Sequence, residues 1–287
     1  MISLKEIKSR ILSVTSTKKI TSAMKMVSSA KLHKSQAAIT NFLPYEEKLN
    51  FVTRNFLSQE ANSNPFAENR EISKVTLVLF SSNSSLCGAF NNNVIRKFEE
   101  VNAQYKDAEV TIYTIGKKVH EYVTKRKYNV AGSFDFLTEK PDYNEISKLV
   151  DTLTNSFLSG KTDRIELIFN HFKSAGTQII QTDTLLPFTF KEQENDLGTV
   201  ADYIVEPDKE SLIQELIPKV IRSKMYGTLL DSIASEHGAR TTAMQVASEN
   251  ASELIQDLTL QYNKARQEVI TNEILDIVGG AEASRKG

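Results

Sequence analysis

Apolar residues near the start of the chain recur at helical spacing. They are three or four positions apart, first at Leu4, Ile7, Ile11 and Val14 and then, after a slip of phase, at Ile20, Met24, Val27 and Ala30. Spacing of this kind places side chains on one face of a helix. Neither glycine nor proline occurs before Pro44, so we expect a helix over residues 2–58, ended by the turn-forming segment 62–65.

A second and longer helical pattern fills the C-terminal part. Its apolar stripe also steps by three or four residues, at Met244, Ala247, Ala251, Ile255, Leu258, Tyr262, Ala265 and Val269. These steps are close to the 3.5-residue period of a left-handed coiled coil. Glycine and proline are absent from Ala239 to Val278. We expect the helix to begin at Lys209 behind Asp208 as its cap, with Pro218 as a kink or first-turn residue.

A helix of this length is unusual in a globular protein unless it pairs with another helix. The charged residues Glu249, Glu253, Asp257 and Lys264 exclude a membrane span for it. The simplest arrangement pairs the two chain ends as an antiparallel coiled coil. Ordinary amphipathic packing in a helix bundle is the alternative.

The middle of the chain alternates strand-like and helix-like patterns at short spacing. Strands are expected at 74–80, 109–115, 164–172 and 177–185, and helices at 91–105, 116–127 and 143–158. Such alternation is typical of a parallel or mostly parallel sheet covered by helices. The predicted fold is therefore an α/β domain at 72–200, inserted between an N-terminal shaft helix at 1–60 and a C-terminal shaft helix at 209–287.

Composition and charge narrow the class of protein. The chain has 287 residues, 40% of them hydrophobic, and a formal net charge of −1. These values are typical of a folded globular protein and give no basic excess for binding nucleic acid. The single cysteine, Cys87, excludes an internal disulfide and fits a reducing compartment. The basic segment 1–40 is either a solvated helix face or a surface for an acidic partner.

No catalytic, cofactor-binding or metal-ligating pattern emerges. The chain contains no G-x-G-x-x-G, and Gly116-Lys117-Lys118 lacks the hydroxyl residue and the earlier glycine of a Walker loop. The four histidines, His33, His120, His171 and His237, show no ligand spacing. At the turn 86–91, Gly88 serves either simple turn geometry or the approach of a phosphate, and Cys87 is either a nucleophile or an inert thiol. The balance favours a mechanical or binding role.

Several segments at the two ends resemble the gamma subunit of F-type ATP synthases. They are residues 18–31, 235–244, 262–274 and 277–283. The resemblance implies an antiparallel coiled coil that carries a Rossmann-like domain. It also implies a non-catalytic central shaft in a ring of three alpha and three beta subunits, joined at its base to an epsilon subunit and a c-subunit ring. No cofactor is then expected on this chain, since ATP and magnesium would be bound by alpha and beta.

The resemblance also implies roles for individual residues. Contacts with alpha and beta are expected at Met24, Lys25, Arg240, Arg266, Gln267 and Thr271. Contacts with the c ring and epsilon are expected at Lys31, Lys34, Tyr203, Glu206 and Asp208. A solvated helix surface is the alternative for each of them.

Two departures from the family pattern affect this interpretation. Ser82-Asn83-Ser84-Ser85 stands where the family usually has Ser-Asp-Arg-Gly, so any role of that Asp and Arg is in doubt here. The cysteine-bearing insertion of the chloroplast type is absent, and no transit peptide is recognised. We therefore expect a peripheral position on the cytoplasmic side of a bacterial plasma membrane.

Two other classes of function remain. A scaffold or filament protein would use the coiled coil only to assemble with itself, and an ATPase partner would argue against it. A small α/β enzyme with helical arms would bind a specific ligand as an isolated chain.

Overall fold

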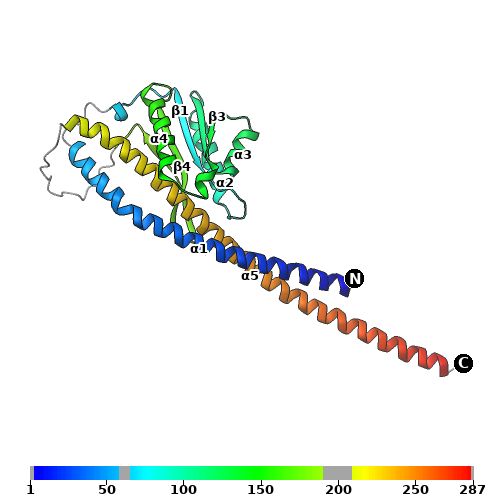
Figure 1. Ribbon diagram of the computed structural model, residues 1–287. Helices are drawn as coiled ribbons and strands as arrows, with labels where there is room; N and C mark the ends of the chain where they lie inside the picture. Colours follow the sequence, from blue (N-terminus) through cyan, green and yellow to red (C-terminus); the bar gives the residue numbers. More distant parts are fainter. Residues whose placement is uncertain (1–2, 58–64, 190–208, 286–287) are drawn as a thin grey trace. The chain divides into compact units, whose positions relative to one another are not determined.

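The computed structural model describes residues 3–57, 65–189 and 209–285. It contains two long terminal helices and a sheet with shorter helices between them in the sequence (Figure 1). The elements, in chain order, are α1 (Leu4–Leu57), η1 (Pro65–Ala67), β1 (Lys74–Phe80), α2 (Phe90–Gln104), β2 (Glu109–Ile115), α3 (Lys117–Lys125), β3 (Val130–Ser133), η2 (Asp135–Thr138), α4 (Tyr143–Leu158), β4 (Arg164–Ser174), β5 (Thr177–Leu186) and α5 (Lys209–Arg285). None of the described helices is long and apolar enough to cross a bilayer.

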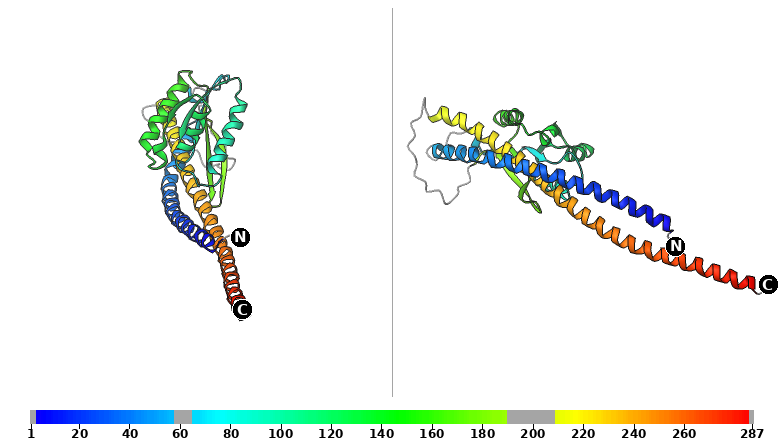
Figure 2. Two further views of the ribbon diagram at one scale, coloured as in Figure 1. Left: turned by 90° about the vertical axis from the view of Figure 1, so that its right-hand side faces the viewer. Right: turned by 60° about the horizontal axis from the view of Figure 1, so that its bottom comes forward.

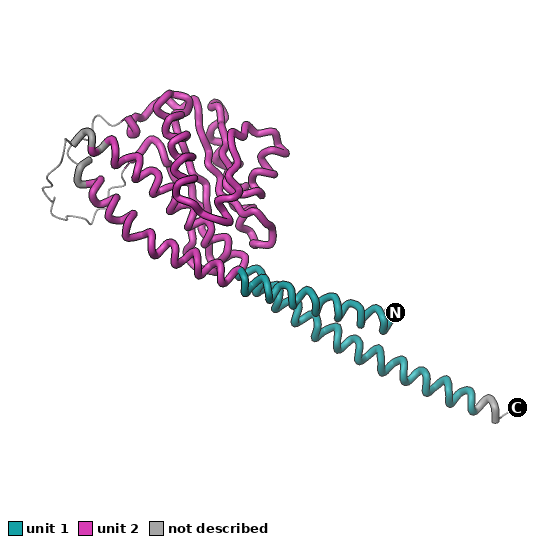
Figure 3. The backbone as a smooth tube through the Cα atoms, viewed as in Figure 1, with its two compact units in different colours: residues 1–27, 241–287 teal, residues 28–240 magenta. Residues whose placement is uncertain are grey.

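The chain forms two compact units (Figure 3). Unit 1 contains residues 1–27 and 241–287, and unit 2 contains residues 28–240. These units group residues by their contacts. The expected domains at 1–60, 72–200 and 209–287 instead treat each long helix as one piece. Each long helix contributes one part to unit 1 and another to unit 2.

Unit 1 is an antiparallel pair of helical segments, which lie beside each other in Figure 2. On α5 the buried residues Met244, Ala251 and Leu258 are seven apart, and Ala265 is half-buried. A seven-residue repeat is the seam of a left-handed coiled coil, because it keeps one face turned to the partner helix. The predicted antiparallel coiled coil is confirmed.

On α1 the seam keeps its phase, so the predicted slip is wrong. Ile7 is buried and Val14 half-buried, and the next seam position is the buried Thr21. Ile20 and Val27, which the apolar pattern placed on the seam, are 59% and 57% exposed. Burial here follows the heptad geometry of the helix pair, even where the seam residue is polar.

Unit 2 holds a five-stranded sheet in the order β3-β2-β1-β4-β5. The pairs β1–β2, β1–β4 and β2–β3 are parallel, and β4–β5 is antiparallel. This confirms the mostly parallel sheet and the α/β class. Strand β3 was not predicted, because it has only four residues, Val-Ala-Gly-Ser, with little apolar signal.

Helices cover both faces of the sheet (Figure 1). Helices α2 and α3 pack on one face through Val94, Phe98, Val101, Val119 and Val123. Helix α4 and the first part of α5 pack on the other face, and α5 contributes Ile217, Ile221, Met225 and Leu229, which have essentially no exposed surface. The first part of α5 is thus a layer of the α/β domain.

Candidate interaction surfaces

The β1–α2 loop, residues 81–89, lies at the carboxyl end of β1. Strands β2 and β3 lie on one side of β1 and β4 on the other, so the strand order reverses here. In open α/β sheets this is where ligands usually bind. Two residues of the loop have left-handed backbone, Leu86 with φ 69° and Gly88 with φ 59°. Leu86 is the unusual one, because a side chain is strained at this φ, and it is also 61% exposed.

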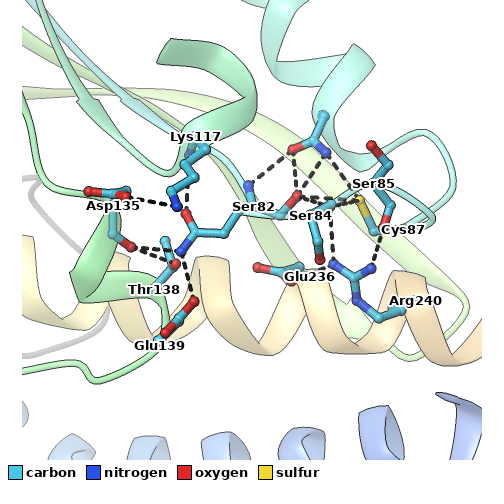
Figure 4. Close-up of polar contacts among 12 residues, drawn as sticks. Ser82, Ser84, Ser85, Cys87, Lys117, Asp135, Thr138, Glu139, Glu236 and Arg240 are labelled. Atoms are coloured by element: carbon cyan, nitrogen blue, oxygen red, sulfur yellow. Dashed lines mark hydrogen bonds and ion pairs between the residues drawn. The ribbon is translucent and has the colours of Figure 1, made fainter. Parts of the chain in front are cut away.

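Hydrogen bonds tie the loop to the start of α2. The Ser82 N–H donates to Asn91 Oδ1 at 3.0 Å, and Asn91 Nδ2 donates to Ser82 Oγ at 2.8 Å. The Ser82 hydroxyl donates to the Ser84 carbonyl at 2.7 Å. The loop is therefore folded back on itself at its base (Figure 4).

Arg240 of α5 donates to the main-chain carbonyl oxygens of Ser84 and Ser85 and pairs with Glu236 (Figure 4). A phosphate site would need N–H groups directed inward, whereas this loop turns two carbonyls toward a buried cation. Beside the ion pair, Ala239 packs against Cys87 and Phe90. At this switch point the loop bonds to a side chain of the chain itself, which argues against the nucleotide interpretation of Gly88.

Burial controls the titration of this region. It raises the pKa of Glu236, an effect that Arg240 and Lys31 oppose. It lowers the pKa of His237 to about 4, so this imidazole is neutral near pH 7. Burial also raises the pKa of Cys87, a residue that is 1% exposed, so the interpretation of its thiol as inert is favoured over a nucleophile.

Asn83 stands where the family usually has an aspartate, and its contacts are internal. Its Oδ1 accepts the N–H of Lys117, at the start of α3, at 3.1 Å. Its Nδ2 donates to the carbonyl of Asp135 at 3.0 Å and to Glu139 Oε1 at 3.3 Å. The amide thus links the loop to α3 and η2, which a carboxylate could do only in part because it donates no proton.

Asp231 of α5 holds the β4–β5 hairpin and was not singled out from the sequence. Its Oδ1 accepts the N–H of Phe172 at 2.8 Å, and its Oδ2 lies 2.7 Å from His171 Nδ1. At the tip of the same hairpin, the Cα of Gly238 faces Phe172 and the backbone of Ala175. No local pattern marks Asp231, since its partners are about sixty residues away in the sequence.

The last part of α5 has no cover within the described chain. Every residue from 266 to 281 is exposed. The large apolar side chains among them are 41% to 71% exposed, namely Val269, Ile270, Ile274, Leu275, Ile277 and Val278. Val269 was predicted on the seam, but the seam ends at Ala265. Exposed apolar surface of this extent usually marks a protein contact.

Comparison with known proteins decides the family. A profile of the ATP synthase family matches residues 3–283. The ATP synthase gamma chain of Phocaeicola vulgatus is 50% identical over 289 residues, which cover 99% of this chain and 100% of that one. This chain belongs to the ATP synthase gamma chain family. The gamma chain of Flavobacterium johnsoniae is 48% identical and covers 99% of each chain.

Solved structures of ATP synthases share the fold. A chain of the Euglena gracilis mitochondrial ATP synthase rotor superposes with a TM-score of 0.68 at 19% identity, over 93% of this chain and 98% of that chain. A chain of the Tetrahymena thermophila central stalk and c ring gives a TM-score of 0.58 at 21% identity, over 80% and 99%. The resemblance of the terminal motifs to the gamma chain family is confirmed.

The family-derived contact residues lie in different environments. In unit 1, Met24 and Lys25 are half-buried, whereas Arg266, Gln267 and Thr271 are exposed. The Thr271 hydroxyl donates to the main-chain carbonyl of Gln267 at 2.9 Å, within α5 itself.

The remaining expected contact residues belong to unit 2 or lie outside the described residues. Lys31 and Lys34 are exposed. Arg240 is 7% exposed, so in the chain alone its charge faces inward. Tyr203, Glu206 and Asp208 lie outside the described residues, as does the expected cap of α5.

Proposed function

We propose that this chain is the central rotor shaft of a proton-translocating F-type ATP synthase. It couples rotation of a c-subunit ring to conformational change in the catalytic beta subunits, and it is itself non-catalytic. The observation that carries this proposal is the bare end of α5, residues 266–281. Its apolar side chains have no partner in the described chain, so an external partner is needed to bury them.

The distribution of these side chains separates the shaft from a scaffold. At about 100° per residue, Val269, Ile270, Ile274, Leu275, Ile277 and Val278 spread over about two-thirds of the helix circumference. A helix that self-assembles through a coiled coil presents a narrow seam instead. A helix enclosed by a ring of subunits meets protein on all sides, which fits a broad apolar surface.

Coupling follows from the asymmetry of the shaft. A helix pair has different side chains on each face, so the three beta subunits around it are contacted differently at any moment. Only contacts that differ between conformations can shift a catalytic site among its states. As the shaft turns, each beta subunit meets each face in sequence. ATP and magnesium are bound by alpha and beta, and the chemistry takes place there.

Specific contacts complete the proposal. Met24 and Lys25 contact the acidic lever segment of beta, and Arg240 is coupled to that region from its buried position. Arg266, Gln267 and Thr271 contact the alpha and beta subunits around the shaft tip. Lys31, Lys34, Tyr203, Glu206 and Asp208 face the c ring and the epsilon subunit. The complex holds three alpha and three beta subunits per copy of this chain. It places the chain peripherally on the cytoplasmic side of a bacterial plasma membrane.

The test is a pull-down of the tagged chain from gently solubilised membranes, with co-purifying subunits counted by native mass spectrometry. We expect three alpha and three beta subunits per chain, with epsilon and c subunits. The variant with Ile274→Asp and Leu275→Asp should lose alpha and beta. Leu158→Asp, which places one aspartate at a 40% exposed leucine of α4, should retain them. Recovery of self-oligomers alone would refute the shaft and support the scaffold.

A further inference from the structure

The guanidinium of Arg240 is buried and serves the chain's own fold. Its Nη2 donates to Glu236 Oε1 at 2.7 Å and to the Ser84 carbonyl at 3.3 Å, and its Nη1 donates to the Ser85 carbonyl. We propose that Arg240 is a positioning residue, which fixes the β1–α2 loop against α5 and thereby sets the position of the exposed Leu86 side chain.

The backbone geometry explains how Arg240 acts on Leu86. The Ser85 carbonyl belongs to the peptide plane that joins Ser85 to Leu86. Rotation of that plane changes the φ angle of Leu86, which is 69°. A leucine at this φ is strained and persists only when its surroundings hold it. The bond from Arg240 holds the plane, so it opposes relaxation of Leu86 toward negative φ.

Glu236 is the residue that keeps Arg240 in place. The two residues are one helical turn apart on α5, and their side chains are 10% and 8% exposed. A buried ion pair is stable only when both charges are present and their remaining hydrogen-bonding groups are used. Glu236 supplies the charge opposite Arg240. The carbonyls of Ser84 and Ser85 accept further hydrogen bonds from the Arg240 guanidinium. The ion pair thus orients the guanidinium toward the loop.

A second set of bonds makes the loop a rigid extension of the sheet. Ser82 and Asn91 close its base, and Asn83 links it to α3 and η2. With Arg240 added, the loop is held both from the sheet and from α5. Its tip is the 61% exposed Leu86, whose position is therefore fixed relative to α5. In its last step this inference rests on the proposed function, since a fixed tip matters to a rotor that contacts other subunits.

We call the attachment of the β1–α2 loop to α5 by Arg240 the clamp. Hydrogen exchange of the full-length chain, followed by mass spectrometry, tests it directly. The reporting amides are those of Ser82 and Phe90, which are hydrogen-bonded within the loop and at its end. Peptides from β1 and β2 serve as the internal reference for global stability. Glu236→Gln is compared with the double variant Glu236→Gln and Arg240→Met. Both lack the buried carboxylate, but only the second lacks the donor to the loop. Ser85→Ala is the matched control, because it keeps the main-chain acceptor.

We expect exchange in the loop to be about tenfold or more faster in the double variant than in Glu236→Gln, since hydrogen bonds from a charged donor are among the stronger ones. Exchange in β1 and β2 should not change, and Ser85→Ala should behave as the parent. Unchanged loop exchange would overturn the clamp. Equal acceleration in the loop and in the sheet would also overturn it, because Arg240 would then act only on global stability.

Arg240→Lys keeps the test decisive if the double variant does not fold. Lysine keeps a charge beside Glu236, but its single ammonium lacks the planar fork that spans two carbonyls. Faster loop exchange in this variant supports the clamp, and parental exchange refutes it.

A coupling measurement distinguishes failure of the clamp from failure of the proposed rotor function. In the assembled complex, protons pumped per ATP hydrolysed are compared for Glu236→Gln and the double variant. A lower ratio in the double variant supports the role of the clamp in coupling. Faster loop exchange with an equal ratio supports the clamp and refutes its role in the rotor.

Discussion

The substitution Gly238→Ala should destabilise unit 2, although alanine is the better helix former. A Cβ at this position would lie 3.0 Å from Cε2 of Phe172 and 3.3 Å from the Cα of Ala175. The second neighbour is backbone, and the hairpin that carries it is held to α5 by Asp231. Alanine gains about 1 kcal/mol over glycine in a helix interior, while overpacking costs about 1–3 kcal/mol. We expect a net loss of about 1 kcal/mol.

Two other glycines of α5 provide matched controls. A Cβ at Gly279 meets nothing within 4 Å, so Gly279→Ala should strengthen the helix end. A Cβ at Gly227 lies 3.3 Å from the carboxylate of Glu46, the movable end of a flexible side chain, so Gly227→Ala should stabilise the protein by up to about 1 kcal/mol, the helix preference of alanine over glycine.

Urea unfolding followed by far-UV circular dichroism measures the effect of Gly238→Ala on the main transition. For Gly279→Ala the readout is hydrogen exchange of residues 275–285, because the end of a helix opens locally. If Gly238→Ala were as stable as the parent, the close contact with the hairpin backbone would not limit packing, and the reasoning would fail.

Three further predictions concern charge, protonation and thiol chemistry. If Lys18, Lys19 and Lys25 of the basic segment 1–40 face the acidic segment of beta, replacing them by glutamate should uncouple ATP turnover from proton transport in membrane vesicles, and unchanged coupling would count against that contact. The pKa of His237 is lowered to about 4, mainly by burial, so the unfolded chain takes up this proton near pH 6.5 and the folded chain only near pH 4. The free energy of unfolding should therefore fall by about 3 kcal/mol as pH falls through this window, and His237→Gln should lose that part of the dependence in urea titrations. Cys87 should react with a thiol reagent only on unfolding, and rapid labelling of the native chain would contradict its burial.

The long helices and the sheet class were predictable because they depend on repeated spacing. The seam of α5 follows its apolar residues, so reading periodicity located it from Met244 to Ala265. On α1 the same reading failed after Val14. The most apolar residues there, Ile20 and Val27, face outward, while the small polar Thr21 occupies the seam. Hydrophobicity located the seam on α5, where the seam positions are apolar, and missed it on α1, where a seam position is a threonine.

The contacts of the β1–α2 loop were not predictable. Arg240 and Ser85 are 155 positions apart, and the acceptor is a main-chain carbonyl that any residue provides. A sequence therefore carries no signal of this bond. The family resemblance placed Arg240 at a partner contact, whereas the structure shows which groups its side chain binds in the chain alone. The role of Asn83 between α3 and η2 was hidden for the same reason.

One segment of α5, residues 232–240, is buried around its whole circumference, and this has a mechanical consequence. Every residue from 232 to 240 is buried, on all faces of more than two helical turns. A helix that rests on a core through one stripe can roll about its own axis by exchanging neighbouring contacts. A helix gripped on every side cannot, because any roll disturbs close-packed contacts around the full circle. Within unit 2, a torque applied to this segment is therefore transmitted to the sheet as rotation of the whole body, with little torsional slack.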